Sequence, residues 1–250
     1  MLNRVRRGSD HPRIIVGVPG SWPSRTALVQ AVAGESGGYL FAGRVLMNTA
    51  TKESWELEVY EQDPNLARAF ALAGRGSVTD VDLEAVAAHT CTAYLIGEGG
   101  SAEVAQRTMD AACGLLRAGG VGVKVESAGK AHSRTDWAAL AERHEPSALY
   151  DAYVTLIGGD GGGCSCGMQN LGLADAAANA ELSDLEGARL LRAFLLYTLL
   201  EQPDLRSGHT FGLNPQSPRY RLTLEPCRMY KRDDPFFNPY GVWRLESVSG

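Results

Sequence analysis

A strand–helix–strand pattern between residues 92 and 125 limits the folds open to this chain more than any other feature of the sequence. Residues 92–97 form one apolar run and residues 121–125 form a second one. Between them, Ser101 can cap a helix with one apolar face, and a pair of glycines can end it. The pattern predicts a βαβ unit whose two strands run in the same direction.

The residues before this unit predict a further strand, a helix and a hairpin. Residues 13–18 are a β-branched run, and an alanine- and leucine-rich stretch follows up to Gly34. Residues 39–47 and 55–59 alternate between apolar and polar side chains, which favours an antiparallel pair of strands. Together with the βαβ unit, this order predicts a ferredoxin-like first half. Shorter patterns predict helices over residues 80–89 and 137–144 and a strand over residues 152–157.

The second half predicts a different arrangement. Ser183 and Glu186 match a capping box that opens a helix running to about Glu201, and this helix is apolar on nearly every face. Alternation over residues 219–224 and an apolar run over residues 240–245 predict two strands. The fold class that follows is α+β, or mixed α/β, with a second and smaller α/β lobe.

A glycine-dense stretch, residues 158–167, is the natural place to divide the chain. We predict a flexible leader over residues 1–12, an α/β lobe over residues 13–157 and a second α/β lobe over residues 158–250 packed on the first. A single domain containing both lobes is the alternative.

Composition excludes several classes of protein. A hydrophobic content of 44% over 250 residues is enough for a core, and 24 basic against 29 acidic residues give no nucleic-acid footprint. The most apolar stretch, residues 193–200, is far shorter than the roughly 18 residues that a membrane span requires. Five cysteines without a repeated spacing argue against a disulfide framework and predict a cytoplasmic protein.

The sharpest motif lies in the glycine-dense stretch. Gly163, Ser165 and Gly167 fit G-x-S-x-G, the turn that exposes a serine nucleophile in many hydrolases. Asp175, or alternatively Asp184, and then His209 follow in the order that such hydrolases use. A nucleophile elbow runs directly from a strand into a helix, whereas several glycines interrupt this segment. A hydrolase using Ser165, or a thiol enzyme using Cys166, with His209 is therefore the alternative hypothesis.

The same segment permits a metal site. Cys164 and Cys166 could bind zinc together with His209 or Cys227. One-residue spacing is not the spacing of structural zinc knuckles, and the chain has neither a P-loop nor a dinucleotide-binding glycine motif. We therefore expect no metal and no cofactor.

A ligand site without catalysis uses the same part of the chain. Where residues 161–167 meet residues 207–211, flexible backbone lies beside cysteine, serine, histidine and threonine. The predicted ligand-binding residues are Gly163, Cys166, His209 and Thr210. A mobile loop between two lobes is the competing interpretation. His89, His132 and His144 have no partner at ligand spacing and are predicted to be structural, and the aromatic residues of 236–243 are predicted to pack.

Three segments carry a resemblance to a known family. They are residues 165–175, residues 207–211 and residues 238–243, with looser similarity in the order of the front helix and hairpin. Over residues 94–245 the chain resembles DUF4261, an uncharacterised bacterial family of domains of unknown function. The resemblance implies a bacterial, cytosolic α/β protein, and it implies no reaction, ligand or catalytic residue.

The residues favour binding over catalysis. No spaced set of acid, base, nucleophile or metal ligands stands out, so the leading hypothesis is an intracellular protein that binds another protein or a small ligand near the junction of its two halves. We expect neither nucleic acid nor a membrane among its partners.

Overall fold

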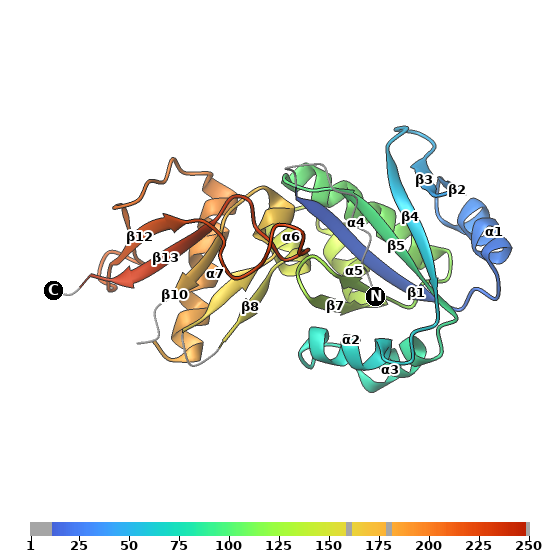
Figure 1. Ribbon diagram of the computed structural model, residues 1–250, viewed down its shortest axis with the longest axis horizontal. Helices are drawn as coiled ribbons and strands as arrows, with labels where there is room; N and C mark the ends of the chain where they lie inside the picture. The colour runs from blue at the N-terminus through green and yellow to red at the C-terminus, as the bar shows by residue number, and fades with distance from the viewer. Residues whose placement is uncertain (1–11, 159–161, 179–181, 249–250) are drawn as a thin grey trace.

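The computed structural model describes residues 12–158, 162–178 and 182–248. Its strands form two sheets, which lie one beyond the other along the longest dimension of the molecule (Figure 1). The first sheet has seven strands and the second has six, and helices pack against both. This arrangement confirms the α+β class. The predicted leader lies outside the described residues except for Pro12.

Four strands form the centre of the first sheet. In spatial order they are β4 (Ser54–Glu61), β5 (Cys91–Glu98), β1 (Arg13–Gly20) and β6 (Gly122–Val125), and each neighbouring pair is antiparallel. This is the strand order of a ferredoxin-like sheet. The strands of the predicted βαβ unit, β5 and β6, do run in the same direction, but β1 lies between them, so the unit is split.

Shorter strands extend this sheet at both edges. The antiparallel pair predicted over residues 39–47 and 55–59 is present in part: residues 39–47 are not one strand but turn back as β2 (Tyr39–Ala42) and β3 (Val45–Asn48), and β3 pairs with β4. At the other edge β7 (Lys130–Ser133) pairs with β6. On β1, Ile14, Val16 and Val18 are fully buried, since every second side chain of a strand points to the same face.

Helices cover the sheet in two groups. The larger core lies under α1 (Arg25–Glu35), α4 (Ala102–Arg117) and α5 (Arg134–Glu142). A separate small cluster joins α2 (Leu66–Gly74) and α3 (Asp80–Ala87) to β7. The cap of α4 is the predicted one, because the Ser101 hydroxyl accepts a hydrogen bond from the Val104 amide at 3.2 Å.

The second sheet has the order β11-β12-β13-β10-β9-β8. These strands are β8 (Thr155–Ile157), β9 (Cys164–Cys166), β10 (Asp175–Ala178), β11 (Thr210–Phe211), β12 (Tyr220–Glu225) and β13 (Val242–Ser247). Only β10 and β13 pair in parallel. The predicted strands over residues 219–224 and 240–245 correspond to β12 and β13.

One long helix, α7 (Asp184–Glu201), packs on this sheet and begins at the predicted capping box. The Ser183 hydroxyl donates to Glu186 Oε2 at 2.6 Å, and the Glu186 amide donates back to the Ser183 oxygen. Phe194 is fully buried, and its ring meets that of Trp243 at a centroid distance of 6.4 Å. The helix is therefore held by the apolar face of the sheet.

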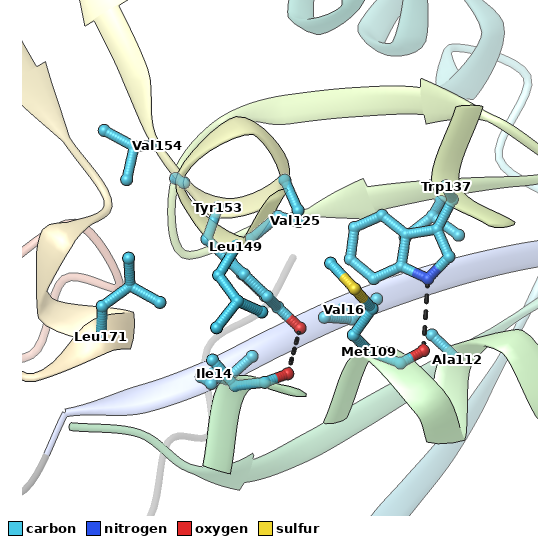
Figure 2. Close-up of a cluster of buried hydrophobic side chains, with 14 of the residues drawn as sticks. Ile14, Val16, Met109, Ala112, Val125, Trp137, Leu149, Tyr153, Val154 and Leu171 are labelled. Carbon is cyan, nitrogen blue, oxygen red and sulfur yellow. Dashed lines mark hydrogen bonds between the residues drawn. The ribbon is translucent and has the colours of Figure 1, made fainter. Parts of the chain in front are cut away.

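Helix α6 (Pro146–Tyr153) and the 3-10 turn η1 (Met168–Leu171) lie between the sheets. Figure 2 shows the buried side chains there, where Tyr153 donates a hydrogen bond to the Ala105 carbonyl at 2.9 Å and Trp137 donates one to the Met109 carbonyl at 3.3 Å. One continuous cluster of buried residues extends from Ile14 in β1 to Leu245 in β13. The two sheets therefore share a core.

Two sequence predictions near the division of the chain are wrong. Residues 152–157 are not one strand, because α6 runs to Tyr153 and only residues 155–157 form β8. The stretch 158–167 is not simply a loop, because it contains β9, which pairs with β8; its residues 159–161 lie outside the described residues. Since β8 belongs to the second sheet, any boundary falls before it. The division into two domains stays a prediction.

The long connection from β12 to β13, residues 226–241, returns from the second sheet to the junction (Figure 1). Phe236 lies against Gly129, and Asn238 is almost completely buried. Among the described residues, no helix is both long enough and apolar enough to cross a membrane.

Candidate functional site

The motif serine lies in a buried hydrogen-bonded cluster. Ser165 on β9 donates to Asp175 Oδ1 on β10 at 2.7 Å, and Asn238 from the β12–β13 connection donates to Asp175 Oδ2 at 2.7 Å. The Met168 amide also donates to Asp175 Oδ1, at 3.3 Å. We call Ser165, Asp175 and Asn238 the Asp175 network. Its side chains join two neighbouring strands, β9 and β10, to a segment 63 residues beyond Asp175.

Burial sets the electrostatics of this network. The side chain of Asp175 is taken out of water, and this desolvation raises its pKa to about 6, although hydrogen bonds from Asn238 and Ser165 oppose the change. The Ser165 oxygen accepts a hydrogen bond from the Ala176 amide at 2.9 Å. Asp175 and Ser165 are only 4% and 6% exposed. The network therefore faces the protein rather than a cleft that a substrate could enter.

His209 does not complete a catalytic arrangement with Ser165 or Cys166. It directly precedes β11, whereas both other residues lie on β9, and strands β12, β13 and β10 separate the two. Since neighbouring strands lie about 4.8 Å apart, four steps across the sheet place them about 19 Å apart. The other predicted acid, Asp184, lies at the start of α7. The predicted triad geometry is wrong, because order along the chain did not reveal the order of the strands.

The cysteines of the segment are unsuited to thiolate chemistry and to the predicted zinc site. Cys166 is 2% exposed, and desolvation raises its pKa far above the ordinary value for a thiol. Cys164 lies on the same strand and its pKa is also raised by burial. Cys227 lies on the β12–β13 connection, and His209 is on the far edge of the sheet. Within the residues that the structure describes, no group of three side chains could hold a metal ion.

A groove lies at the far edge of the second sheet. It has a volume of about 790 Å³ and lies between the C-terminal half of α7 and the segment around β11. Its walls include Tyr197 of α7, His209, Thr210, Phe211 and Arg219. We call this the α7 groove. Two of the four predicted ligand-binding residues, His209 and Thr210, line it.

The other two predicted ligand-binding residues lie elsewhere. Gly163 is next to β9, where the Leu191 side chain of α7 would lie 3.3 Å from an added Cβ atom, and Cys166 is buried in β9. Residues 162–167, the described part of the predicted segment 161–167, and residues 207–211 therefore do not form one site, because they lie at opposite sides of the same sheet.

The α7 groove combines an aromatic wall with positive charge. The rings of Tyr197 and Phe211 lie 5.7 Å apart at an interplanar angle of 32°. Arg219 makes no ion pair with any described residue, and no carboxylate belongs to the groove lining. The His209 Nδ1 atom accepts a hydrogen bond from the Arg206 amide at 3.4 Å, which orients the imidazole. This lining suits a ligand with a flat apolar part and an anionic group.

Sequence reasoning missed three residues of these sites. Tyr197 belongs to the helix that the sequence describes as apolar on nearly every face, a pattern that does not distinguish it from the buried residues, yet it is 37% exposed at the groove. Arg219 and Asn238 acquire their neighbours only when the β11–β12 hairpin and the β12–β13 connection are in place. For Arg219 the sequence offered one signal, the alternation over residues 219–224, which places its side chain on the polar face of the predicted strand.

Comparison with protein-family models, curated proteins and solved structures gave no match to this chain. The resemblance to the bacterial family of unknown function stays a prediction, and function has to be argued from the site itself.

Proposed function

We propose that this is a cytoplasmic binding protein that takes a small ligand, composed of a flat apolar body and an anionic group, into the α7 groove. The observation that carries the proposal is the groove lining, which joins an aromatic pair to Arg219 and His209 with no carboxylate among the described residues that line it. A volume of about 790 Å³ lies within the range of small-molecule sites. The cytoplasmic location rests on the cysteine usage of the sequence.

Each part of the lining has a separate role in this proposal. Tyr197 and Phe211 offer ring faces on which a planar ligand stacks, and Arg219 offers a guanidinium for a carboxylate, sulfonate or phosphate group. His209 and Thr210 add polar contacts that fix orientation. The floor is apolar, since it includes Leu222, which is fully buried.

Binding is preferred over catalysis because of where the candidate nucleophiles lie. Ser165 and Cys166 are buried on β9, and the predicted base, His209, lies at the far edge of the same sheet. The Ser165 hydroxyl donates a hydrogen bond to Asp175, and this bond orients it within the core. These contacts support a structural role for the motif serine.

A fluorescent aromatic sulfonate, 8-anilinonaphthalene-1-sulfonate, has the proposed chemistry and tests the groove directly. We expect saturable fluorescence enhancement with the folded protein. Arg219→Ala and Tyr197→Ser should each weaken binding by about tenfold, which corresponds to about 1.4 kcal/mol. The neutral analogue N-phenyl-1-naphthylamine should bind more weakly than the sulfonate to the wild type and about equally to Arg219→Ala.

Arg68→Ala is the matched control, since Arg68 is an exposed arginine on α2, far from the second sheet. Thermal unfolding of each variant establishes that it is folded at the assay temperature. Equal titrations for the Arg219→Ala and Arg68→Ala proteins would overturn the proposal, and so would the absence of saturable enhancement in the wild type.

A further inference from the structure

A second groove lies on the first sheet, where nothing in the proposed function requires one. It has a volume of about 480 Å³ and lies between α4, α5 and the strands β2 and β3. We call it the α4–α5 groove. It is independent of the α7 groove, because it shares no residue with it and belongs to the other sheet.

Its walls carry both signs of charge. Asp110 and Arg117 of α4 and Arg134 and Glu142 of α5 all line the groove, so each helix contributes one guanidinium group and one carboxylate. On α4, Asp110, Cys113 and Arg117 follow the spacing i, i+3, i+7, which places them on one face. Ala138 and Ala141 of α5 are small, and they leave space between the charged ends of that helix.

The charges converge on a neutral floor. Burial raises the pKa of Cys113 to about 11, so the thiol is protonated at neutral pH, and Arg117, Asp110 and Glu142 all lie close enough to influence it. Tyr39 is 5% exposed at the other side of the floor, and burial raises its pKa too. Because the Cys113 thiol and the Tyr39 phenol are both neutral, the charged side chains of the walls dominate the electrostatics of the groove.

One of the arginines is held in a fixed position. Arg117 donates from Nε and Nη2 to the Ser36 carbonyl at 2.9 and 2.7 Å. Gly37, at a φ of 79°, lies against it, and a Cβ atom there would approach Arg117 Nε to 3.1 Å. The guanidinium therefore stands at the groove without a carboxylate partner among the described residues. Arg134 and Glu142 likewise make no ion pair among these residues.

A ligand of a single charge would meet unfavourable charges in this groove, whereas a molecule with both charges finds partners for each. We propose that the α4–α5 groove binds a free α-amino acid, with its carboxylate at Arg117 and Arg134 and its ammonium group at Asp110 and Glu142. The apolar part of the ligand then lies against Ala138 and Ala141. Asp110 keeps its existing hydrogen bond from Gln106, at 3.0 Å, through Oδ1, which leaves Oδ2 for the ammonium group.

Isothermal titration calorimetry with L-leucine, L-phenylalanine, L-glutamate and L-lysine tests the proposal. At least one of the four should bind at millimolar concentration or below. For that amino acid, the N-acetyl form lacks the cation and the amide form lacks the anion. Each of these forms should bind about tenfold more weakly or worse, since each loses one charged pair.

Two conservative variants assign the charges. Glu142→Gln should weaken the binding of the free amino acid. It should leave the affinity for the N-acetyl form unchanged, because that form has no ammonium group to interact with Glu142. Arg134→Gln should weaken the binding of the free amino acid. It should leave the affinity for the amide form unchanged, because that form has no carboxylate to interact with Arg134. Both side chains are exposed, so neither change should impair folding.

Glu61→Gln and Arg68→Gln are matched controls, since both residues are exposed and lie outside the groove. Arg219→Ala should leave amino-acid binding unchanged, so failure of the α7 groove proposal and failure of this one are separate results. The inference is overturned if none of the four amino acids binds. It is also overturned if the blocked forms bind as well as the free one, or if Arg134→Gln and Glu142→Gln behave like the controls.

Discussion

The two sheets use their buried polar side chains in different ways. In the first half, Trp137, Tyr153 and His132 each bond to one backbone carbonyl, those of Met109, Ala105 and Ala152. In the second half, Ser165, Asp175 and Asn238 bond to each other. Each of the first three bonds joins one side chain to one backbone segment, whereas Asp175 accepts from two side chains of different segments at once, so its bonds depend on one another. The first half is therefore held mainly by apolar packing, and the junction by a few polar bonds that depend on one another.

The largest expected effect tests whether this difference divides the molecule. Trp137 is fully buried and its ring meets that of Tyr153 at 5.7 Å. Trp137→Ala should lower the free energy of unfolding by about 3–5 kcal/mol, because it leaves a large cavity. Since both sheets share one core, hydrogen exchange followed by mass spectrometry should show the same loss of protection in β1 and β5 as in β12 and β13.

Leu72→Ala is the control for this experiment, since Leu72 is 70% exposed and its loss should change stability by less than about 0.5 kcal/mol. Loss of protection confined to the first sheet would mean that the two halves unfold separately, despite the continuous buried cluster.

The second effect concerns the network itself. Asn238→Ala removes the donor to Asp175 Oδ2 and to the Leu173 carbonyl, and it leaves a buried carboxylate without one partner. We expect a loss of about 2–3 kcal/mol in urea unfolding. Asn65→Ala is the matched control, because Asn65 makes no side-chain capping bond at the start of α2. Similar losses for the two variants would contradict a role for the network.

The third effect separates the two halves by pH. Burial raises the pKa of Asp175 to about 6, so its protonated form favours folding; that contribution is complete below pH 4 and is lost as the pH rises through about 6. Burial lowers the pKa of His132 to about 4, so its contribution is complete above about pH 6.5 and is lost as the pH falls through about 4. The two residues therefore oppose each other between pH 4 and pH 6.5.

Asp175→Asn removes the contribution of Asp175 to the pH dependence of stability. From pH 7 to pH 5 the variant should lose about 1 kcal/mol more stability than the wild type, because only the His132 contribution still changes. Parallel urea titrations at the two pH values measure the difference. An identical change in both proteins would show that Asp175 does not titrate in this range.

Local patterns explain which elements the sequence predicts. The β-branched run over residues 13–18 predicts a strand within six residues, and Ser183 with Glu186 predicts a helix start within four. Such signals require only neighbours along the chain. They therefore predicted the strands of the ferredoxin-like sheet and α7.

The candidate sites depend on contacts that no local pattern contains. Asn238 and Asp175 are 63 residues apart, and Tyr197 meets Phe211 only because β11 pairs with β12 beside α7. His209 follows Ser165 in a plausible catalytic order, but the order of strands in the sheet separates them. Residues 152–157 are apolar enough for either a helix or a strand, and the length of the run did not decide between them.

The smallest expected effect concerns the serine helix caps, which both halves of the molecule contain. Ser101 caps α4 and Ser183 caps α7, each through a hydrogen bond to a backbone amide three residues later. Ser101→Ala and Ser183→Ala should each lower the free energy of unfolding by about 1 kcal/mol, since each leaves an amide at the start of a helix without its acceptor. Chemical denaturation of the two single variants and the double variant measures these losses.

The double variant gives the sharper result. The two caps lie on helices of different sheets and share no hydrogen-bond partner, so their losses should add within about 0.5 kcal/mol if both helices melt in one transition. Two transitions in the double variant would place the division of the chain before β8, with the Asp175 network unfolding together with the second sheet. Additive losses in a single transition would mean that the halves differ in how their polar groups are bonded and not in how they unfold.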